Sequence, residues 1–206
     1  MKATGLAGAL ILLMLLARPG LAQQDGLLQA EPAAVVAAVN EALIGAMREA
    51  GALAFQGRYD RLAQVLMAAF HFPVMARVAA GRHWRDLAPE QKARLAEAFA
   101  RMSITTYAVR FNGYNGESFE VGETIEQPRG GALVRNRLFK SSGEAVAIDY
   151  LLRDFDGRWR IVDLFLDGII SEIATKHSEY NSILKEDGVD GLLARISAKT
   201  DELAAE

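Results

Sequence analysis

The segment LLRDFDGRWRIVDLFLDGIISE, residues 151–172, constrains the fold more than any other part of the chain. Asp156-Gly157 lies between two alternating runs of residues, which is the pattern of a β-hairpin with a two-residue turn. A turn at this point places Phe155 opposite Arg158 and thereby sets the pairing of the residues beyond them. Apolar residues occupy both faces of this hairpin, so we expect other parts of the protein to cover both.

The expected register gives the hairpin one strongly apolar face, which is the better candidate for a deep interior. A slip of one residue would exchange the two faces. The cross-strand pairs predicted on this face are Leu152 with Ile161, Tyr150 with Asp163, Ile148 with Phe165, and Val146 with Asp167.

The pattern of the whole chain predicts an α+β fold, in which helices cover a curved four-stranded antiparallel sheet. Helical spacing extends over residues 31–111 and returns over residues 169–200, and residues 201–206 remain as a tail. The sheet is expected within residues 116–167, with strands at 117–126, 132–140, 145–153 and 158–167. Glycines are expected to end or interrupt helices at Gly51, Gly81 and Gly188.

The first 22 residues read as a secretory signal peptide. Met1-Lys2 is a short basic start, residues 6–16 are almost wholly apolar, and Gly20 and Ala22 are small residues at the positions that a signal peptidase reads. We therefore expect cleavage after Ala22, with an uncleaved N-terminal anchor as the alternative. The later sequence has no run of 18 apolar residues, so no integral membrane segment is expected in the mature protein, and residues 23–200 should form a single domain.

Charge and cysteine content exclude several classes of partner. The chain has 23 basic and 26 acidic residues. Removing residues 1–22 takes away Lys2 and Arg18 and no acid, which leaves 21 and 26, a formal net charge of −5. This balance argues against nucleic acid as a partner and against tight attraction to anionic lipid surfaces. The chain has no cysteine, so disulfides and thiolate metal sites are excluded.

Enzymatic chemistry has one candidate pair. Tyr150 opposite Asp163 in apolar surroundings would suit general acid–base catalysis by a small-molecule enzyme, because burial raises the pKa of a carboxyl group. The simpler alternative is that Tyr150 donates a hydrogen bond to Asp163 and satisfies a buried polar group. The sequence offers no nucleophile with a recognisable general base beside it. His71, His83 and His177 are far apart in the sequence and lack the spacing of metal ligands. The residues therefore favour a protein that is not an enzyme and holds no metal or other cofactor.

Two stretches carry family motifs in combination: FHFPVMARVAAGRHWRDLAPEQKARLAEAF at residues 70–99, and residues 147–173 followed by KEDGVDGLLARI at 185–196. Together they resemble the MlaC-type periplasmic phospholipid carriers, also called toluene-tolerance proteins. His71 departs from the family, which usually has Asp after the Phe. The tail SEIATKHSEY is similar to that of the hopanoid-associated HpnM branch. The motif residues are Met75, Ala76, Arg77, Gly81, Trp84, Arg85, Pro89, Glu90, Gln91, Asp149, Arg153, Trp159, Asp163, Gly168, Ser171 and Gly188.

The resemblance implies a soluble periplasmic lipid-binding protein with an apolar cavity between its sheet and its helices. Its cargo would be a phospholipid or a hopanoid-type lipid, carried between an inner-membrane ABC transport complex and an outer-membrane acceptor complex. The headgroup should stay near solvent, because burying its charge is costly. A scaffold with a filled core that acts only through its surface is a further alternative. The side chains expected to line the cavity are Phe70, Met75, Phe99, Met102, Tyr107, Ile148, Tyr150, Leu152, Ile161, Phe165 and Ile169.

Overall fold

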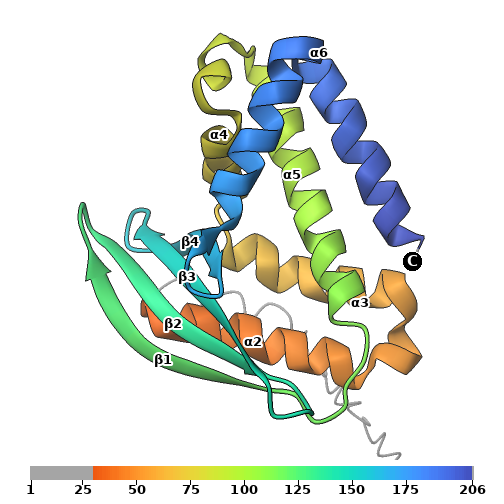
Figure 1. Cartoon of the computed structure of the whole chain (residues 1–206), viewed down its shortest axis with the longest axis vertical. Helices are drawn as coiled ribbons and strands as arrows, with labels where there is room; N and C mark the ends of the chain where they lie inside the picture. The colour runs from red at the N-terminus through yellow and green to blue at the C-terminus, as the bar shows by residue number, and fades with distance from the viewer. Residues whose placement is uncertain (1–29, 206) are drawn as a thin grey trace, which may run out of the picture.

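The computed structural model describes residues 30–205, and the predicted signal peptide with its cleavage site lies outside the described residues. The predicted α+β class is confirmed, with helices on one side of an antiparallel sheet (Figure 1). The helices are α2 (Pro32–Arg48), α3 (Ala50–Ala69), α4 (Phe72–Ala80), the 3₁₀ helix η1 (Gly81–Asp86), α5 (Pro89–Arg110) and α6 (Glu172–Ala204). The strands are β1 (Ser118–Gln127), β2 (Gly131–Phe139), β3 (Ala145–Asp154), β4 (Trp159–Leu166) and β5 (Ile170–Ser171).

Two predicted features of this architecture need correction. The sheet has five strands in the order β1-β2-β3-β4-β5, because the short β5 adds to the edge of β4. Helix α6 continues to Ala204, so residues 201–204 of the predicted tail are helical.

Proline and glycine set several helix boundaries. Pro32, Pro73 and Pro89 lie in the first turns of α2, α4 and α5, where the missing N–H costs nothing. Gly81 ends α4 with φ +56°, and a Cβ there would lie 2.4 Å from Cε1 of His177 on α6. Glycine therefore permits both the turn and the close approach of the two helices.

The other two predicted breaks behave differently from each other. Gly188 has φ +67° and interrupts α6, as expected. Gly51 is helical, and the interruptions near it fall at Glu49, between α2 and α3, and at Ala54 (φ 47°) within α3. The composition of this Ala-rich stretch shows that a break exists without locating it.

Helix α2 contacts the sheet along β1, β2 and β4, whereas α4, α5 and α6 form a second group beyond it (Figure 1). A buried hydrogen bond of 2.8 Å from Asn40 Nδ2 to Asn136 Oδ1 joins α2 to β2. Helices α3, α4 and α6 each reach the sheet at β4. Strand β4 therefore connects the two groups of helices.

The β3–β4 hairpin has the predicted two-residue turn. Phe155 N–H donates to Arg158 O (2.9 Å), and Arg158 N–H donates back to Phe155 O (3.2 Å). Asp156 and Gly157 both have positive φ, as a type I′ turn requires. The predicted pair Leu152–Ile161 is confirmed.

Beyond that pair the predicted register is wrong, because β4 contains a β-bulge. Leu152 pairs with Ile161, but Leu151 pairs with Asp163, so Val162 is an extra residue in β4. From there the two faces of β4 are exchanged relative to the prediction. The observed pairs are Tyr150 with Leu164, Asp149 with Phe165, and Ile148 with Leu166.

The face of the sheet away from α2 holds a polar groove of about 590 Å³. Asp149 is buried within it, accepting a hydrogen bond from Asn136 N–H (3.1 Å) and forming an ion pair with Arg135. Its lining includes Glu123, Arg137 and Asp167. A carboxylate thus links β3 to β2 on the face of β3 opposite Tyr150, which the prediction also gave to Asp149.

Replacing Asp149 by Ala should lower the free energy of unfolding by about 2–4 kcal/mol, because Asn136 N–H loses its acceptor and Arg135 its anion. Asp149→Asn keeps an acceptor oxygen and should lose about half as much. Urea unfolding measures both, with Asp167→Asn, at an exposed residue, as the control for charge. Equal losses in the three variants would contradict this role.

Candidate functional site

The interior between the sheet and the helices is one apolar cluster, and it contains most of the predicted lining residues. Seven of the eleven are buried and belong to this cluster: Phe70, Met75, Phe99, Met102, Tyr150, Leu152 and Ile161. Tyr107 and Ile148 are partly buried and pack against it. The structure therefore brings nine predicted residues together, from the link between α3 and α4 and from α4, α5, β3 and β4.

The other two predicted residues lie elsewhere. Phe165 pairs with Asp149 across the strands, on the face opposite Tyr150, because of the bulge at Val162. Ile169 lies in the turn between β4 and β5 and is 80% exposed. Leu164 takes the place predicted for Asp163, opposite Tyr150, and packs against the cluster, whereas Leu166 takes the place predicted for Phe165, opposite Ile148. The position of Leu164 depends on the bulge at Val162, which the alternation of apolar and polar residues in this strand does not indicate.

Phe70 lies at the centre of the aromatic contacts. Its ring stacks on Phe72, with centroids 5.5 Å apart, and meets Tyr107 and Tyr150 edge-on at 6.0 and 6.3 Å. The backbone after α3 is extended here and runs parallel to β4, where His71 N–H donates to Ile161 O (2.8 Å). Attachment to β4 thus positions the Phe70 ring where sheet and helices meet.

The buried tyrosine hydroxyls make contacts that the hairpin alone does not predict. The Tyr107 side chain hydrogen-bonds that of Tyr150, across from α5 to β3. Burial raises the pKa of Tyr150 to about 12 and that of Tyr107 well above its ordinary value. The predicted Tyr150–Asp163 pair is wrong, so neither the acid–base pair nor the simple hydrogen bond between them forms.

Asp163 instead holds the start of α6. Its carboxylate accepts hydrogen bonds from Ser171 Oγ (2.6 Å), Ile173 N–H (3.1 Å) and Leu164 N–H (2.8 Å). Burial raises the pKa of this carboxyl group, and the three donors act in the opposite direction. Asp163, which suggested catalysis in the sequence, is therefore bonded to three donors that fix the start of α6.

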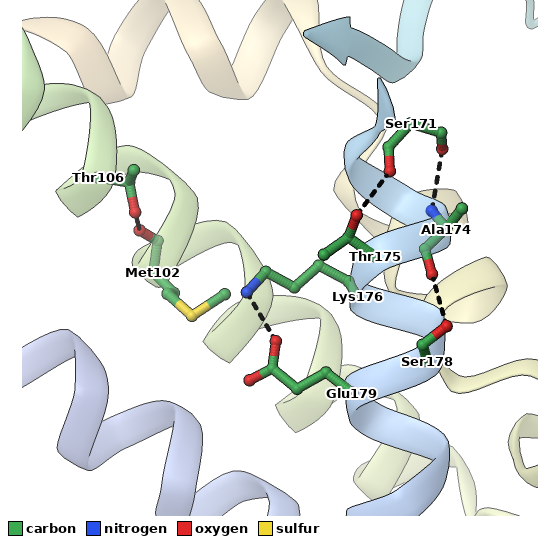
Figure 2. A network of polar contacts seen from close by, with 8 residues as sticks. All are labelled: Met102, Thr106, Ser171, Ala174, Thr175, Lys176, Ser178 and Glu179. Carbon is green, nitrogen blue, oxygen red and sulfur yellow. Dashed lines mark hydrogen bonds and ion pairs between the residues drawn. The ribbon is translucent and has the colours of Figure 1, made fainter. Parts of the chain in front are cut away.

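The hydroxyl side chains in the first turns of α6 bond to the helix itself (Figure 2). Ser171 Oγ accepts from Ala174 N–H (2.9 Å), Thr175 Oγ1 donates to Ser171 O (3.0 Å), and Ser178 Oγ donates to Ala174 O (3.3 Å). On α5, Thr106 Oγ1 likewise donates to Met102 O (2.9 Å). These bonds satisfy backbone groups of the same helix or of its N-cap residue.

Tyr180 on α6 was missed as a site residue, although its helical spacing with Ile173 and Leu184 indicated a buried position. Only 1% of it is exposed, and its ring meets Phe99 edge-on at 6.3 Å. Within the part of the chain that the structure describes, its hydroxyl has no hydrogen-bond partner. Burial raises the pKa of this phenol. The interior thus holds one hydroxyl that is free to bond to another molecule.

Residues 30–205 contain no group of three or more His, Asp or Glu side chains that could hold a metal ion. Over the same residues, no helix combines the length and the apolar character needed to cross a membrane.

Comparison with known proteins adds two findings. The family model described as "MlaC protein" matches residues 37–198. The fold is similar to that of a phospholipid-binding protein from Ralstonia solanacearum, whose structure was determined in complex with a phospholipid. The TM-score is 0.75 at 20% sequence identity, and the match covers 85% of this chain and 99% of that one. At this identity the likeness shows a shared fold.

Replacing Tyr180 by Phe should leave the free energy of unfolding unchanged or raise it by about 1 kcal/mol, because it removes a hydroxyl that has no partner in the folded protein. Thermal and urea unfolding of protein stripped of bound small molecules measure this effect. Phe99→Ala, which removes the ring that Tyr180 contacts, should cost about 3 kcal/mol. A loss above about 1 kcal/mol in Tyr180→Phe would show that the hydroxyl has a protein partner.

The buried Tyr107–Tyr150 pair predicts a loss of stability at alkaline pH. Folding raises the pKa of both phenols, so the unfolded chain ionises at a lower pH than the folded protein. The stability that the neutral phenols contribute is therefore fully present below pH 10 and is lost as the pH rises through about 12. For Tyr150 alone, the free energy of unfolding lost in this way is about 2–3 kcal/mol. Urea unfolding between pH 8 and 11.5 should fall less steeply for Tyr107→Phe/Tyr150→Phe than for Tyr114→Phe, at an exposed tyrosine. Parallel curves would contradict the assignment.

Proposed function

The chain belongs to the MlaC family, and from this premise we propose that it is a soluble periplasmic protein that binds a lipid and carries it between membranes. The route runs between an inner-membrane ABC transport complex and an outer-membrane acceptor complex. The observation that carries the proposal is the apolar interior that the sheet and two groups of helices share. The signal-peptide pattern of residues 1–22 supports the location.

The acyl chains occupy the junction between the inner face of the sheet and the helices. This site excludes Phe165 and Ile169, because the first faces away and the second is exposed. The charged headgroup stays at the surface, where water solvates it. The proposed lining residues are Phe70, Met75, Phe99, Met102, Tyr107, Ile148, Tyr150, Leu152 and Ile161.

Binding requires the interior to rearrange. The proposed lining residues contact one another, with Phe70 against Phe72, Tyr107 and Tyr150. A lipid therefore enters by separating these side chains, which exchanges contacts between protein groups for contacts with methylenes. Because α4 and α6 reach the sheet at β4, the separation occurs along this strand.

The energetics suit exchange between membranes without chemistry. Each buried methylene contributes about 0.8 kcal/mol, so two acyl chains of roughly fifteen methylenes give about 24 kcal/mol relative to water. A bilayer offers a similar gain. Transfer between bilayer and protein is thus nearly balanced, whereas release into water is strongly unfavourable.

The cargo is a phospholipid or a hopanoid-type lipid, and no cofactor beyond this cargo is required. The structure of the Ralstonia protein of the same fold was determined in complex with a phospholipid, and the tail sequence of this chain is similar to that of the HpnM branch. Extraction of the purified protein followed by lipid mass spectrometry distinguishes these classes. A protein that neither retains nor takes up lipid from labelled vesicles would contradict the proposal.

A matched pair of variants tests the position of the cargo. Ile148→Glu places a charge against the proposed acyl chains and should reduce bound lipid at least tenfold, because burying a carboxylate is costly. Ile169→Glu makes the same change at an exposed site and should leave lipid content unchanged. Circular dichroism confirms that both variants fold, and Ile148→Trp, which fills the site without adding charge, should also lower lipid content. Equal lipid content in all variants would exclude this location.

A further inference from the structure

The free end of the sheet brings like charges together. The register of β3 and β4 places Arg153 directly opposite Arg160. Arg158, in the adjoining turn, adds to the effect of burial in lowering the pKa of the Arg160 guanidinium. Like charges opposite each other destabilise a sheet, so this arrangement has an energetic cost for the isolated protein.

Helix α4 adds a further arginine, Arg77, which is exposed in its last turn. The ring of His71 lies 4.1 Å from that of Phe155, in the β3–β4 turn. Burial lowers the pKa of His71, and the charges of Arg160 and Arg77 lower it further against a backbone hydrogen bond. Arg77 on α4 and Arg160 on β4 therefore both act on His71, whose ring touches the β3–β4 turn. Figure 1 shows the β3–β4 turn at the free end of the sheet, beside the link between α3 and α4.

None of these arginines has a carboxylate within 4.0 Å among residues 30–205. The acids of the turn are Asp154 and Asp156, both exposed, and Asp154 accepts a hydrogen bond from Gly157 N–H (2.7 Å). The chain as a whole carries more acidic than basic residues. The net charge thus hides a segregation of charge, with a basic face formed by Arg77, Arg153, Arg158 and Arg160.

Exposed apolar side chains flank the basic face. Met67 is 52% exposed, and its carbonyl oxygen accepts a hydrogen bond of 2.8 Å from Arg160 Nη2, as does that of Phe70. Val78, next to Arg77 on α4, is 47% exposed. Basic side chains interspersed with exposed apolar ones are the pattern of surfaces that lie on membranes.

We propose that the basic face docks the protein on an anionic lipid surface. Arg77 on α4 and Arg158 in the β3–β4 turn are exposed and come from separate segments, so the face can meet more than one phosphate at once without a shaped pocket. The acidic remainder of the chain is repelled by the same surface, which orients the protein with this face toward the membrane. An acidic protein would satisfy the charges but leaves the exposed Met67 and Val78 without a specific role. The proposal deepens the lipid-carrier function and rests on it only in requiring that the protein meet a membrane.

Co-sedimentation with vesicles tests this docking. The protein should bind vesicles of phosphatidylcholine with about 30% phosphatidylglycerol at 50 mM salt, and should bind pure phosphatidylcholine at least tenfold more weakly. Arg77→Gln/Arg158→Gln should weaken binding to the anionic vesicles by about tenfold or more. The control Arg110→Gln/Arg137→Gln removes two other exposed arginines and should change binding less than twofold. Raising the salt to 500 mM should abolish the difference between the two variants.

Lipid content separates this proposal from the carrier function. Both double variants should retain as much lipid as the unsubstituted protein, because neither changes the interior. Equal binding to both vesicle types, or equal weakening by both variants, would overturn the docking proposal. Failure to bind anionic vesicles at 50 mM salt would also overturn it and would leave an acidic protein surface as the partner of these arginines. Loss of lipid binding with intact docking would instead overturn the proposed carrier function alone.

Discussion

The extra residue in β4 determines which side chains face the helices. Before Val162 the strand follows the register that the turn imposes, and after it each side chain lies on the face opposite to that expected. The bulge brings Leu164 to the interior and turns Asp163 toward the start of α6. The anchoring of α6 and the composition of the apolar cluster both depend on this one residue.

Local sequence chemistry predicted the fold class and most element boundaries. Proline in the first turns, the Asp156-Gly157 turn and Gly188 act through the dihedral angles of their own residues, so they can be read locally. The bulge lies beside Ile161, whose carbonyl oxygen accepts a hydrogen bond from His71, so its surroundings include residues far away in the sequence. That is why nine of the predicted lining residues lie together while Phe165 does not, and why Tyr150 meets Tyr107 instead of Asp163. The exposure of Ile169 was missed because periodicity cannot distinguish a turn from the first residues of a helix.

Polar groups divide the molecule into regions that composition cannot reveal. The interior contains two tyrosine hydroxyls that bond to each other and one, that of Tyr180, without a partner in the described chain. A carboxylate joins β3 to β2 on the opposite face of the sheet, and Arg153, Arg158 and Arg160 lie together at the β3–β4 turn. An overall excess of acids is compatible with all three regions, because electrostatic interactions act over short distances at physiological ionic strength.

The contact between Gly81 and His177 has a consequence for how the molecule can move. His177 Nδ1 lies 3.0 Å from Val78 O, so a hydrogen bond joins α4 to the first half of α6. Past Gly188, ion pairs from Asp190 to Arg94 and from Asp201 to Arg101 bind the second half of α6 to α5. The first half of α6 thus contacts both α4 and, through Tyr180 and Phe99, α5, and Gly188 separates it from the second half that these ion pairs hold to α5. Any movement of α4 relative to β4 therefore carries the first half of α6 with it as long as the contact between His177 and Val78 holds.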